Sequence, residues 1–311
     1  MAHIQTVLGP IDPDALGFTL PHEHTQIALW HIESRWDYWQ LTRDQPVIVE
    51  ELARYRDAGG SGLVDLTLPG VGRDALWLRD VATATGLHVV MGCGWYRTAY
   101  YPAEDRIDRR PVDDLADELV GEIENGVGDS GVRPGIIGEI GTDKPWVSPG
   151  EERVHRAAAR AAVRTGLAIT THGVLSDVGL AQLRILEEEG VDPGRVIIGH
   201  ADSYPFLDHH LAIVERGANL EFDFIGMPWE RERLTEPRLV ELIVELLGRG
   251  HADRLFLSQD VCNDSQLTAF GGNGYAYLAE TFLPRLRAAG VSDDEIETMT
   301  VSNPRRLLTI G

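Results

Sequence analysis

Eight short apolar segments, each followed by a longer amphipathic one, constrain the fold of this chain more than any other feature. Apolar runs of this length are typical of strands buried on both faces, and the segments between them carry apolar residues at helical spacing. Strands that alternate with helices form a parallel sheet, and eight such units in 311 residues predict an α/β fold of the closed (β/α)8 TIM-barrel type. The expected strands are 17–20, 62–68, 87–93, 135–140, 167–171, 195–199, 218–224 and 254–258.

The segments outside the strands complete this prediction. Several expected helices end in glycine, which closes a helix in the left-handed conformation. Residues 4–17 predict a small N-terminal β-hairpin at the bottom of the barrel, and no linker divides residues 1–311, so we expect a single domain. The glycine-rich nucleotide loop of an open doubly wound sheet is missing after the first strand. The expected helices are 46–57, 73–85, 112–124, 149–165, 177–190, 206–216, 236–248 and 275–289.

The acidic composition limits the partners of the chain. Asp and Glu number 49 against 28 Lys and Arg, a formal net charge of −21. A surface this acidic repels nucleic-acid backbones and anionic lipids, so we expect no nucleic acid and no membrane as partners. The two cysteines, Cys93 and Cys262, cannot build a disulfide framework, and no secretory signal is visible. The expectation is a cytoplasmic protein.

Side chains that bind metals gather where five of the expected strands end. The carboxyl ends of the strands carry the chemistry in a (β/α)8 barrel. Residues i and i+2 of a strand share a face, so His22 and His24 can enter the barrel together. Four imidazoles and two carboxylates overfill one tetrahedral zinc site and suit two metal ions. The six residues are His22, His24, Glu139, His172, His200 and Asp260. The other histidines, His209 and His210 among them, are expected on the surface or in loops.

The chain resembles the phosphotriesterase family of the amidohydrolase superfamily over essentially its whole length. The motifs that carry the resemblance are TLPHEHT, VDLTLPGVGRD, GEIGT, TTHG, IIGHAD, LSQD and NPRRLL, in this order. The resemblance implies that His22, His24 and Asp260 bind the more buried of two divalent metal ions, and that His172 and His200 bind the more exposed one. It also implies a fourth-strand carboxylate that bridges both ions.

The bridging residue separates this chain from many members of the family. Many of them use a carboxylated lysine, whereas the fourth strand here ends in Glu139, and the only lysine, Lys144, lies five residues further on. The chain therefore resembles the glutamate-bridged subset. Zinc is the default metal for these ligands, and manganese, cobalt or iron would also fit. The implied mechanism uses a metal-bridging hydroxide as nucleophile, with Asp260 transferring its proton to the leaving group.

Further residues are expected around the substrate. In this family an aromatic residue after strand three borders the substrate, for which Tyr96 is the first choice and Trp95 the second. The hydroxyl of Tyr96 can reach the metal-bound oxygen. Asp202 follows His200 by two residues and is expected to orient a ligand imidazole or the hydroxide. The expected substrate contacts outside this group, chosen as cations or aromatics near the mouth, are Arg97, Trp229, Arg231 and Arg233.

The predicted function is metal-dependent hydrolysis of a small molecule. The leading substrate class is a lactone, phosphorylated or carboxylated where arginines face it. The alternatives are an amidase on small N-acyl compounds, with organophosphate triester hydrolysis as a side activity, and a metal-retaining binding protein without turnover. The complete ligand set, Asp260 included, argues against the last alternative. Family members often form homodimers, so the resemblance allows a homodimer here.

Overall fold

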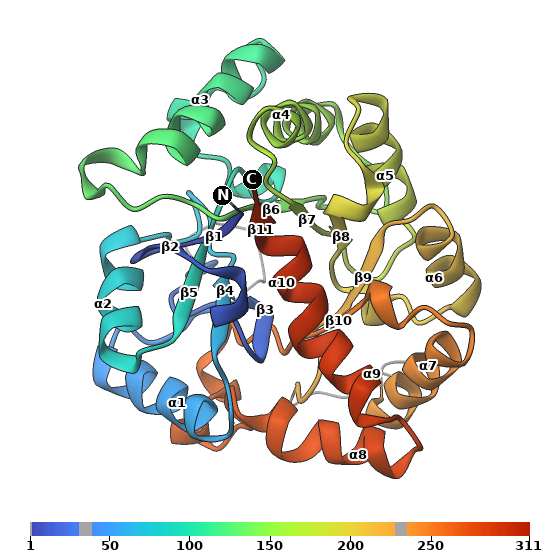
Figure 1. Cartoon of the computed structure of the whole chain (residues 1–311). Helices are drawn as coiled ribbons and strands as arrows, with labels where there is room; N and C mark the ends of the chain where they lie inside the picture. The colour runs from blue at the N-terminus through green and yellow to red at the C-terminus, as the bar shows by residue number, and fades with distance from the viewer. Residues whose placement is uncertain (1, 31–38, 228–234) are drawn as a thin grey trace.

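Eight parallel strands form the centre of the molecule, and helices surround them (Figure 1). The structure is a computed structural model, and it describes residues 2–30, 39–227 and 235–311. The strands are hydrogen-bonded in sequence order from β3 to β10, which confirms the predicted (β/α)8 barrel. They are β3 (Thr19–Glu23), β4 (Gly62–Asp65), β5 (His88–Cys93), β6 (Ile136–Gly141), β7 (Ile169–His172), β8 (Val196–Ile198), β9 (Asn219–Phe222) and β10 (Leu255–Leu257).

The outer helices follow the predicted segments closely. For example, Ser148 and Glu151 form a reciprocal capping box at the start of α4, and Gly166 ends that helix with a φ of 76°. The expected helix 275–289 differs, because it begins as a π-helical turn, Leu278–Phe282, and continues as α8. The helices are α1 (Gln45–Asp57), α2 (Ala75–Thr85), α3 (Val112–Asn125), α4 (Pro149–Thr165), α5 (Gly179–Glu188), α6 (Leu207–Val214), α7 (Glu236–Gly248), α8 (Leu283–Ala288), α9 (Asp293–Glu297) and α10 (Asn303–Leu308).

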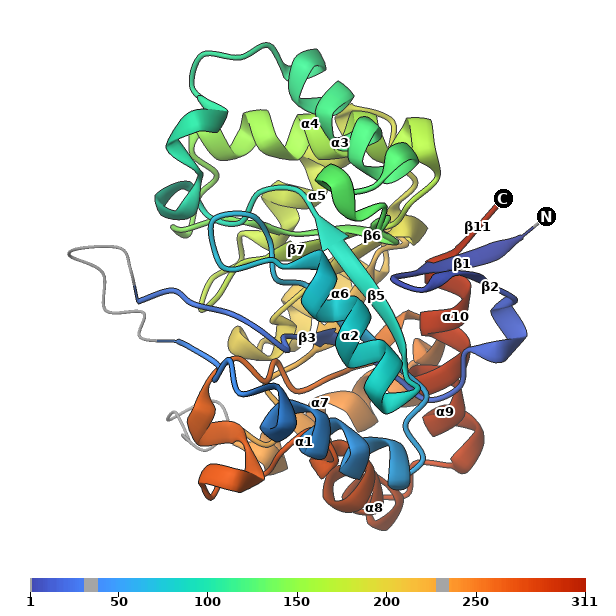
Figure 2. The same cartoon turned by 90° about the vertical axis from the view of Figure 1, so that its left-hand side faces the viewer.

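A small antiparallel sheet lies at the amino-terminal end of the barrel strands. The predicted hairpin is formed by β1 (His3–Thr6) and β2 (Gly9–Ile11), and the C-terminal strand β11 (Thr309–Ile310) pairs with β1. Figure 2 shows these three strands side by side, next to α10. The N–H of Val7 donates to the carbonyl oxygen of Val89, 2.9 Å away, near the start of β5. Apolar side chains of the barrel interior pack against Ile4, so the bottom of the barrel is closed and apolar.

The barrel closes between β3 and β10, the two ends of the hydrogen-bonded strand order. The hydroxyl of Ser258 accepts from the N–H of His22 at 3.0 Å, and the N–H of Asp260 donates to the carbonyl oxygen of His22 at 3.2 Å. Side chains and loop backbone therefore hold this seam, defined as the contact between 22–23 and 258–261. The described part of the chain contains no helix long and apolar enough to span a bilayer.

Candidate metal centre

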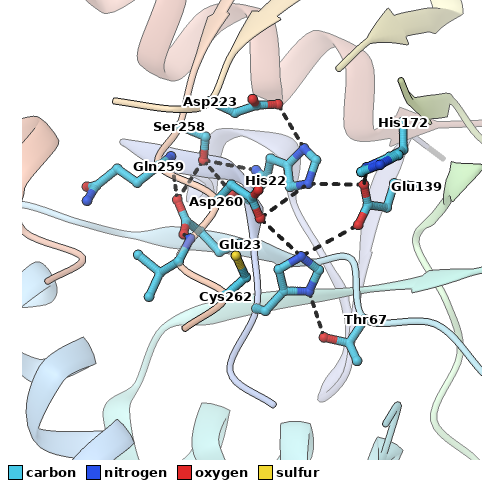
Figure 3. A network of polar contacts seen from close by, with 12 residues as sticks. His22, Glu23, Thr67, Glu139, His172, Asp223, Ser258, Gln259, Asp260 and Cys262 are labelled. Atoms are coloured by element: carbon cyan, nitrogen blue, oxygen red, sulfur yellow. Dashed lines mark hydrogen bonds and ion pairs between the residues drawn. The ribbon is translucent and has the colours of Figure 1, made fainter. Parts of the chain in front are cut away.

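The six predicted ligand side chains lie together at the carboxyl ends of the strands, and each is at most 8% exposed. His22, Glu139 and Asp260 of this set point toward one another (Figure 3). Nε2 of His24 lies 3.3 Å from Oδ1 of Asp260 and 3.6 Å from Oε1 of Glu139. Nε2 of His22 lies 3.5 Å from Oε2 of Glu139 and 3.9 Å from Oδ1 of Asp260.

The second group, after His22 with His24, is His172 and His200, which contact the same oxygen of Glu139 that faces His22. Oε2 of Glu139 is 2.7 Å from Nδ1 of His172 and 3.4 Å from Nε2 of His200. The same two ring nitrogens are 2.6 Å apart. The two oxygens of Glu139 therefore face four imidazoles, two from each group: Oε1 faces His24, and Oε2 faces the other three.

The donor set fits divalent cations. Nε2 of His22 is buried and has no hydrogen-bond partner among the described residues, a costly state for a polar atom unless it serves as a ligand. Ligand atoms that share one cation at bonds of about 2.0–2.2 Å lie roughly 3–4 Å apart. The distances from His22 and His24 to Glu139 and Asp260, 3.3–3.9 Å, fall in this range. Two overlapping triads have all their ligand atoms within 4.8 Å of one another. They are His22 with His24 and Asp260, and His22 with Glu139 and His200.

The other ring nitrogens are held by buried polar groups that the sequence analysis missed. Nδ1 of His24 is 2.9 Å from Oγ1 of Thr67. Nδ1 of His22 is 3.0 Å from Oδ2 of Asp223 and 3.1 Å from Oε2 of Glu221. Such partners fix the orientation of a ligand imidazole. The sequence does contain a signal for the partners of His22. Glu221 and Asp223 are acidic residues two positions apart in the apolar segment 218–224, and this spacing places both on the same, interior face of the strand.

Burial and mutual charge set the protonation of the site in the absence of metal. Burial disfavours the charged ring of His22, but the carboxylates of Asp223 and Glu139 outweigh it and raise the pKa of His22 well above its ordinary value. Burial would raise the pKa of Glu139, but His172 and His22 hold it well below its usual range. Burial lowers the pKa of His172 to about 4. In the metal-free protein His22 therefore carries a positive charge beside Glu139, whereas His172 is neutral near pH 7.

A cavity of about 160 Å³ opens over the ligands. Tyr96 lines it, and the hydroxyl of this residue lies 3.4 Å from Nε2 of His172. Arg97 also lines it, with its guanidinium 4.7 Å from the ring of Tyr96 and 5.0 Å from that of Tyr100. An ion pair of 3.6 Å joins Arg97 to Asp143. The apolar part of the wall consists of Ile27, Leu29, Trp39, Val174, Leu175, Phe224 and Met227.

Trp95 and Asp202, two expected site residues, do not line the cavity. Trp95 is buried beside the cavity rather than in its wall, because its indole N–H donates to Asp105 at 2.6 Å. Among the described residues Asp202 makes no hydrogen bond to an imidazole: its carboxylate accepts the N–H of Phe224 at 2.7 Å, and Asp223 has the contact with His200. That Asp202 orients the hydroxide stays a prediction. Three expected substrate contacts, Trp229, Arg231 and Arg233, lie outside the described residues.

The expectation of a solvated His209–His210 pair is wrong for His210. Its ring is fully buried, with Nε2 2.8 Å from the carbonyl oxygen of Ala201 and the ring against Phe222. Adjacent residues of α6 point in directions about 100° apart, so one of the pair faces the barrel. His155 on α4 is also buried, bonded to the carbonyl oxygen of Glu151.

In this (β/α)8 barrel, histidines and carboxylates at the ends of the strands meet at one cavity. This is the architecture of a metal-dependent hydrolase. Comparison with known proteins gives the family. The model of the phosphotriesterase family matches residues 2–308. The chain therefore belongs to the phosphotriesterase family, and it is a hydrolase.

Relatives of this chain differ in the reactions that their names describe. The phosphotriesterase homology protein of Escherichia coli is 36% identical over 94% of this chain and 97% of its own length. An N-acetyltaurine hydrolase of Tetraodon nigroviridis is 30% identical over 98% of this chain and 97% of its own. The solved structure of a lactonase from Listeria monocytogenes superposes with a TM-score of 0.91 at 26% identity, covering 98% of both chains.

Proposed function

We propose that this protein is a binuclear metal-dependent hydrolase that opens the ester bond of a small lactone. The observation that carries the proposal is the position of Glu139, whose two oxygens contact the imidazoles of both ligand groups. The similarity to a lactonase along the whole chain supports the substrate class. His22, His24 and Asp260 would hold one ion, His172 and His200 the other, and Glu139 both. Divalent cations held there would lower the pKa of a water molecule to near neutrality and polarise the scissile carbonyl group.

The chain's own groups would handle the proton. Asp260 has the most exposed carboxylate of the site, at 11% of its side chain, and it lines the cavity, so it can take a proton from water and deliver it to the leaving oxygen. Burial raises the pKa of Tyr96 well above its ordinary value. Its hydroxyl therefore keeps its proton and can donate a hydrogen bond to the substrate.

The cavity wall limits the substrate. The aliphatic and aromatic side chains near the mouth favour an apolar ring or chain on the lactone. Among the described lining residues, Arg97 is the one arginine or lysine, and it favours a carboxylate or phosphate substituent. The proposed partner is therefore a small molecule, and assembly into a homodimer remains a proposal from the family.

A second candidate is hydrolysis of a small N-acyl compound. The specific observation is the full-length similarity to an N-acetyltaurine hydrolase. The same proton transfer by Asp260 would serve an amide, which yields a carboxylate and an amine. We propose phosphotriester hydrolysis only as a side activity of the same site.

The test is a substrate panel on protein loaded with zinc or manganese. The panel contains sugar lactones, phosphorylated lactones, N-acyl amino compounds and a phosphotriester, with proton release followed at about pH 8 and products detected in parallel, because amines that titrate near ~10 take the proton back. We expect lactones to give the highest kcat/KM. If the protein releases an amine and an acid from N-acyl compounds and opens no lactone, the lactonase proposal is wrong and the amidase proposal takes its place.

Replacement of Asp260 by Asn tests the proton transfer. We expect turnover to fall about 10²–10⁴-fold, because the amide oxygen accepts no proton at neutral pH. The matched control is Asp264→Asn, a neighbouring carboxylate that accepts the N–H of Thr42 instead of facing the ligands. Turnover of the Asp260→Asn protein equal to that of the control would remove Asp260 from catalysis.

A further inference from the structure

The carboxylate of Asp223 contacts two ligand histidines, His22 and His200, that the proposed function assigns to different metal ions. Its Oδ2 lies 3.0 Å from Nδ1 of His22, and its Oδ1 lies 2.8 Å from Nδ1 of His200. Oδ2 also accepts the backbone N–H of His200 at 2.9 Å. Asp223 and His22 are fully buried and His200 is 2% exposed, so water does not substitute for these contacts.

Both rings turn their other nitrogen toward Glu139. Nε2 of His22 is 3.5 Å and Nε2 of His200 is 3.4 Å from Oε2 of that residue. A ring that ligates a metal through Nε2 must carry its proton on Nδ1 and needs an acceptor there. One carboxylate, with one oxygen for each ring, supplies that acceptor to both.

The neighbouring polar groups reach only one ring each. Oε2 of Glu221 contacts His22 alone, at 3.1 Å, and Oγ1 of Thr67 contacts His24 alone, at 2.9 Å. Asp223 follows the end of β9, where the N–H of His200 fixes its carboxylate from a third direction. Within the described residues, no other side chain is seen to contact the Nδ1 atoms of two ligand histidines.

We propose that Asp223 is a positioning residue that couples the two metal sites, so that loss of its carboxylate weakens metal binding on both sides at once. The inference rests on the binuclear site of the proposed function. It assigns to Asp223 a role distinct from that of Glu139, because Asp223 holds the outer nitrogens of the imidazoles and touches neither ligand nitrogen.

The experiment compares metal binding in three variants of the full chain. Asp223→Ala removes the shared acceptor, Thr67→Val removes the partner of His24 only, and Glu221→Gln changes a contact of His22 only. Manganese affinity is measured by chelator competition, with metal content per chain and with the paramagnetic resonance signal of manganese pairs as a spectroscopic readout. We expect Asp223→Ala to weaken both binding steps about 10–100-fold, and Thr67→Val and Glu221→Gln to weaken one step each.

A second substitution covers the case in which Asp223→Ala fails to fold, which thermal unfolding of the metal-free protein would show. Asp223→Asn keeps one acceptor oxygen, so we expect one binding step to survive and the signal of manganese pairs to be lost. Asp202→Asn is the matched control, since among the described residues that buried carboxylate accepts the N–H of Phe224 and has no hydrogen bond to an imidazole. Unchanged affinity at either site in Asp223→Ala, or unchanged affinity at both in Asp223→Asn, would overturn the inference. Wild-type protein that binds a single equivalent would instead overturn the binuclear proposal.

Discussion

Tyr96 places a protonated hydroxyl at the edge of the ligand cluster. The contact with Nε2 of His172 is 3.4 Å, long for a hydrogen bond, so the hydroxyl is available to a substrate oxygen beside the ligands. We expect Tyr96→Phe to lower kcat about 10²-fold, the effect of removing one donor to a developing negative charge, with metal content unchanged. Steady-state kinetics with metal analysis checks this. Loss of metal with normal turnover per bound ion would show that Tyr96 only orients His172.

Single residues were predictable from the sequence where their position in the barrel decides their role. His22, His24, His172 and His200 follow or end apolar strands, and the barrel brings such ends together. The role of Asp223 was not predictable from the sequence. An acidic residue near the end of a strand can equally face solvent, and only the structure shows that the imidazoles of His22 and His200 lie beside it. Trp95 and Tyr96 are adjacent, and the sequence alone did not show that only Tyr96 faces the cavity.

The seam between β3 and β10 depends on Glu23. This residue lies between two ligand histidines and faces the opposite side of the strand. Its carboxylate accepts the N–H groups of Gln259 and Val261, each at 2.8 Å, on both sides of Asp260. The hydroxyl of Ser258 is 2.8 Å from the same carboxylate. Glu23 thereby fixes the backbone of Asp260, which has a φ of 47°.

Glu23→Gln tests this role at the level of the seam. An amide has one acceptor oxygen, so at least one N–H of the loop loses its partner, and we expect a loss of about 1–3 kcal/mol in the free energy of unfolding and a lower kcat. Glu51→Gln is the control, because Glu51 is buried and accepts the N–H of Ala269 outside the cavity. Chemical unfolding and kinetics measure both effects. Equal activity of the two variants would contradict a role of Glu23 in positioning Asp260.

The existence and type of most helices and strands were predictable from the sequence, since each apolar run and each amphipathic segment has its own period. The residues at which these elements begin and end were less predictable. β3 begins two residues later than expected and continues through Glu23, because its last residues bond across the seam and not only to β4. The segment 275–289 contains Pro284, which has no N–H to donate, and only its part Leu283–Ala288 is α-helical, after the π-helical turn Leu278–Phe282.

Buried neutral histidines make the whole molecule sensitive to acid. Burial lowers the pKa of His210 to about 4 and that of His155 below its ordinary value of 6.5. Between pH 6.5 and pH 4, the histidines of the unfolded chain take up protons and the buried ring of His210 does not. The free energy of unfolding therefore decreases as the pH falls from 6.5 toward 4. At about 1.4 kcal/mol per pH unit, His210 accounts for a loss of roughly 2 kcal/mol at pH 5.

His210→Gln isolates this contribution, because the amide can still donate to the carbonyl oxygen of Ala201. We expect the free energy of unfolding of the variant to drop less between pH 7 and pH 5 than that of the wild type, by about 2 kcal/mol. Urea unfolding at the two pH values measures it. An equal drop in both proteins would mean that His210 is protonated in the folded state.

The binuclear site is tested most directly by a titration of metal-free protein with zinc or manganese, in which bound metal and hydrolysis of a lactone are measured on the same samples. We predict two equivalents per chain in the wild type, with turnover that rises as the second equivalent binds, and a loss of at least one equivalent in Glu139→Ala. Full turnover with one equivalent, or two bound equivalents in Glu139→Ala, would contradict the carboxylate-bridged binuclear site.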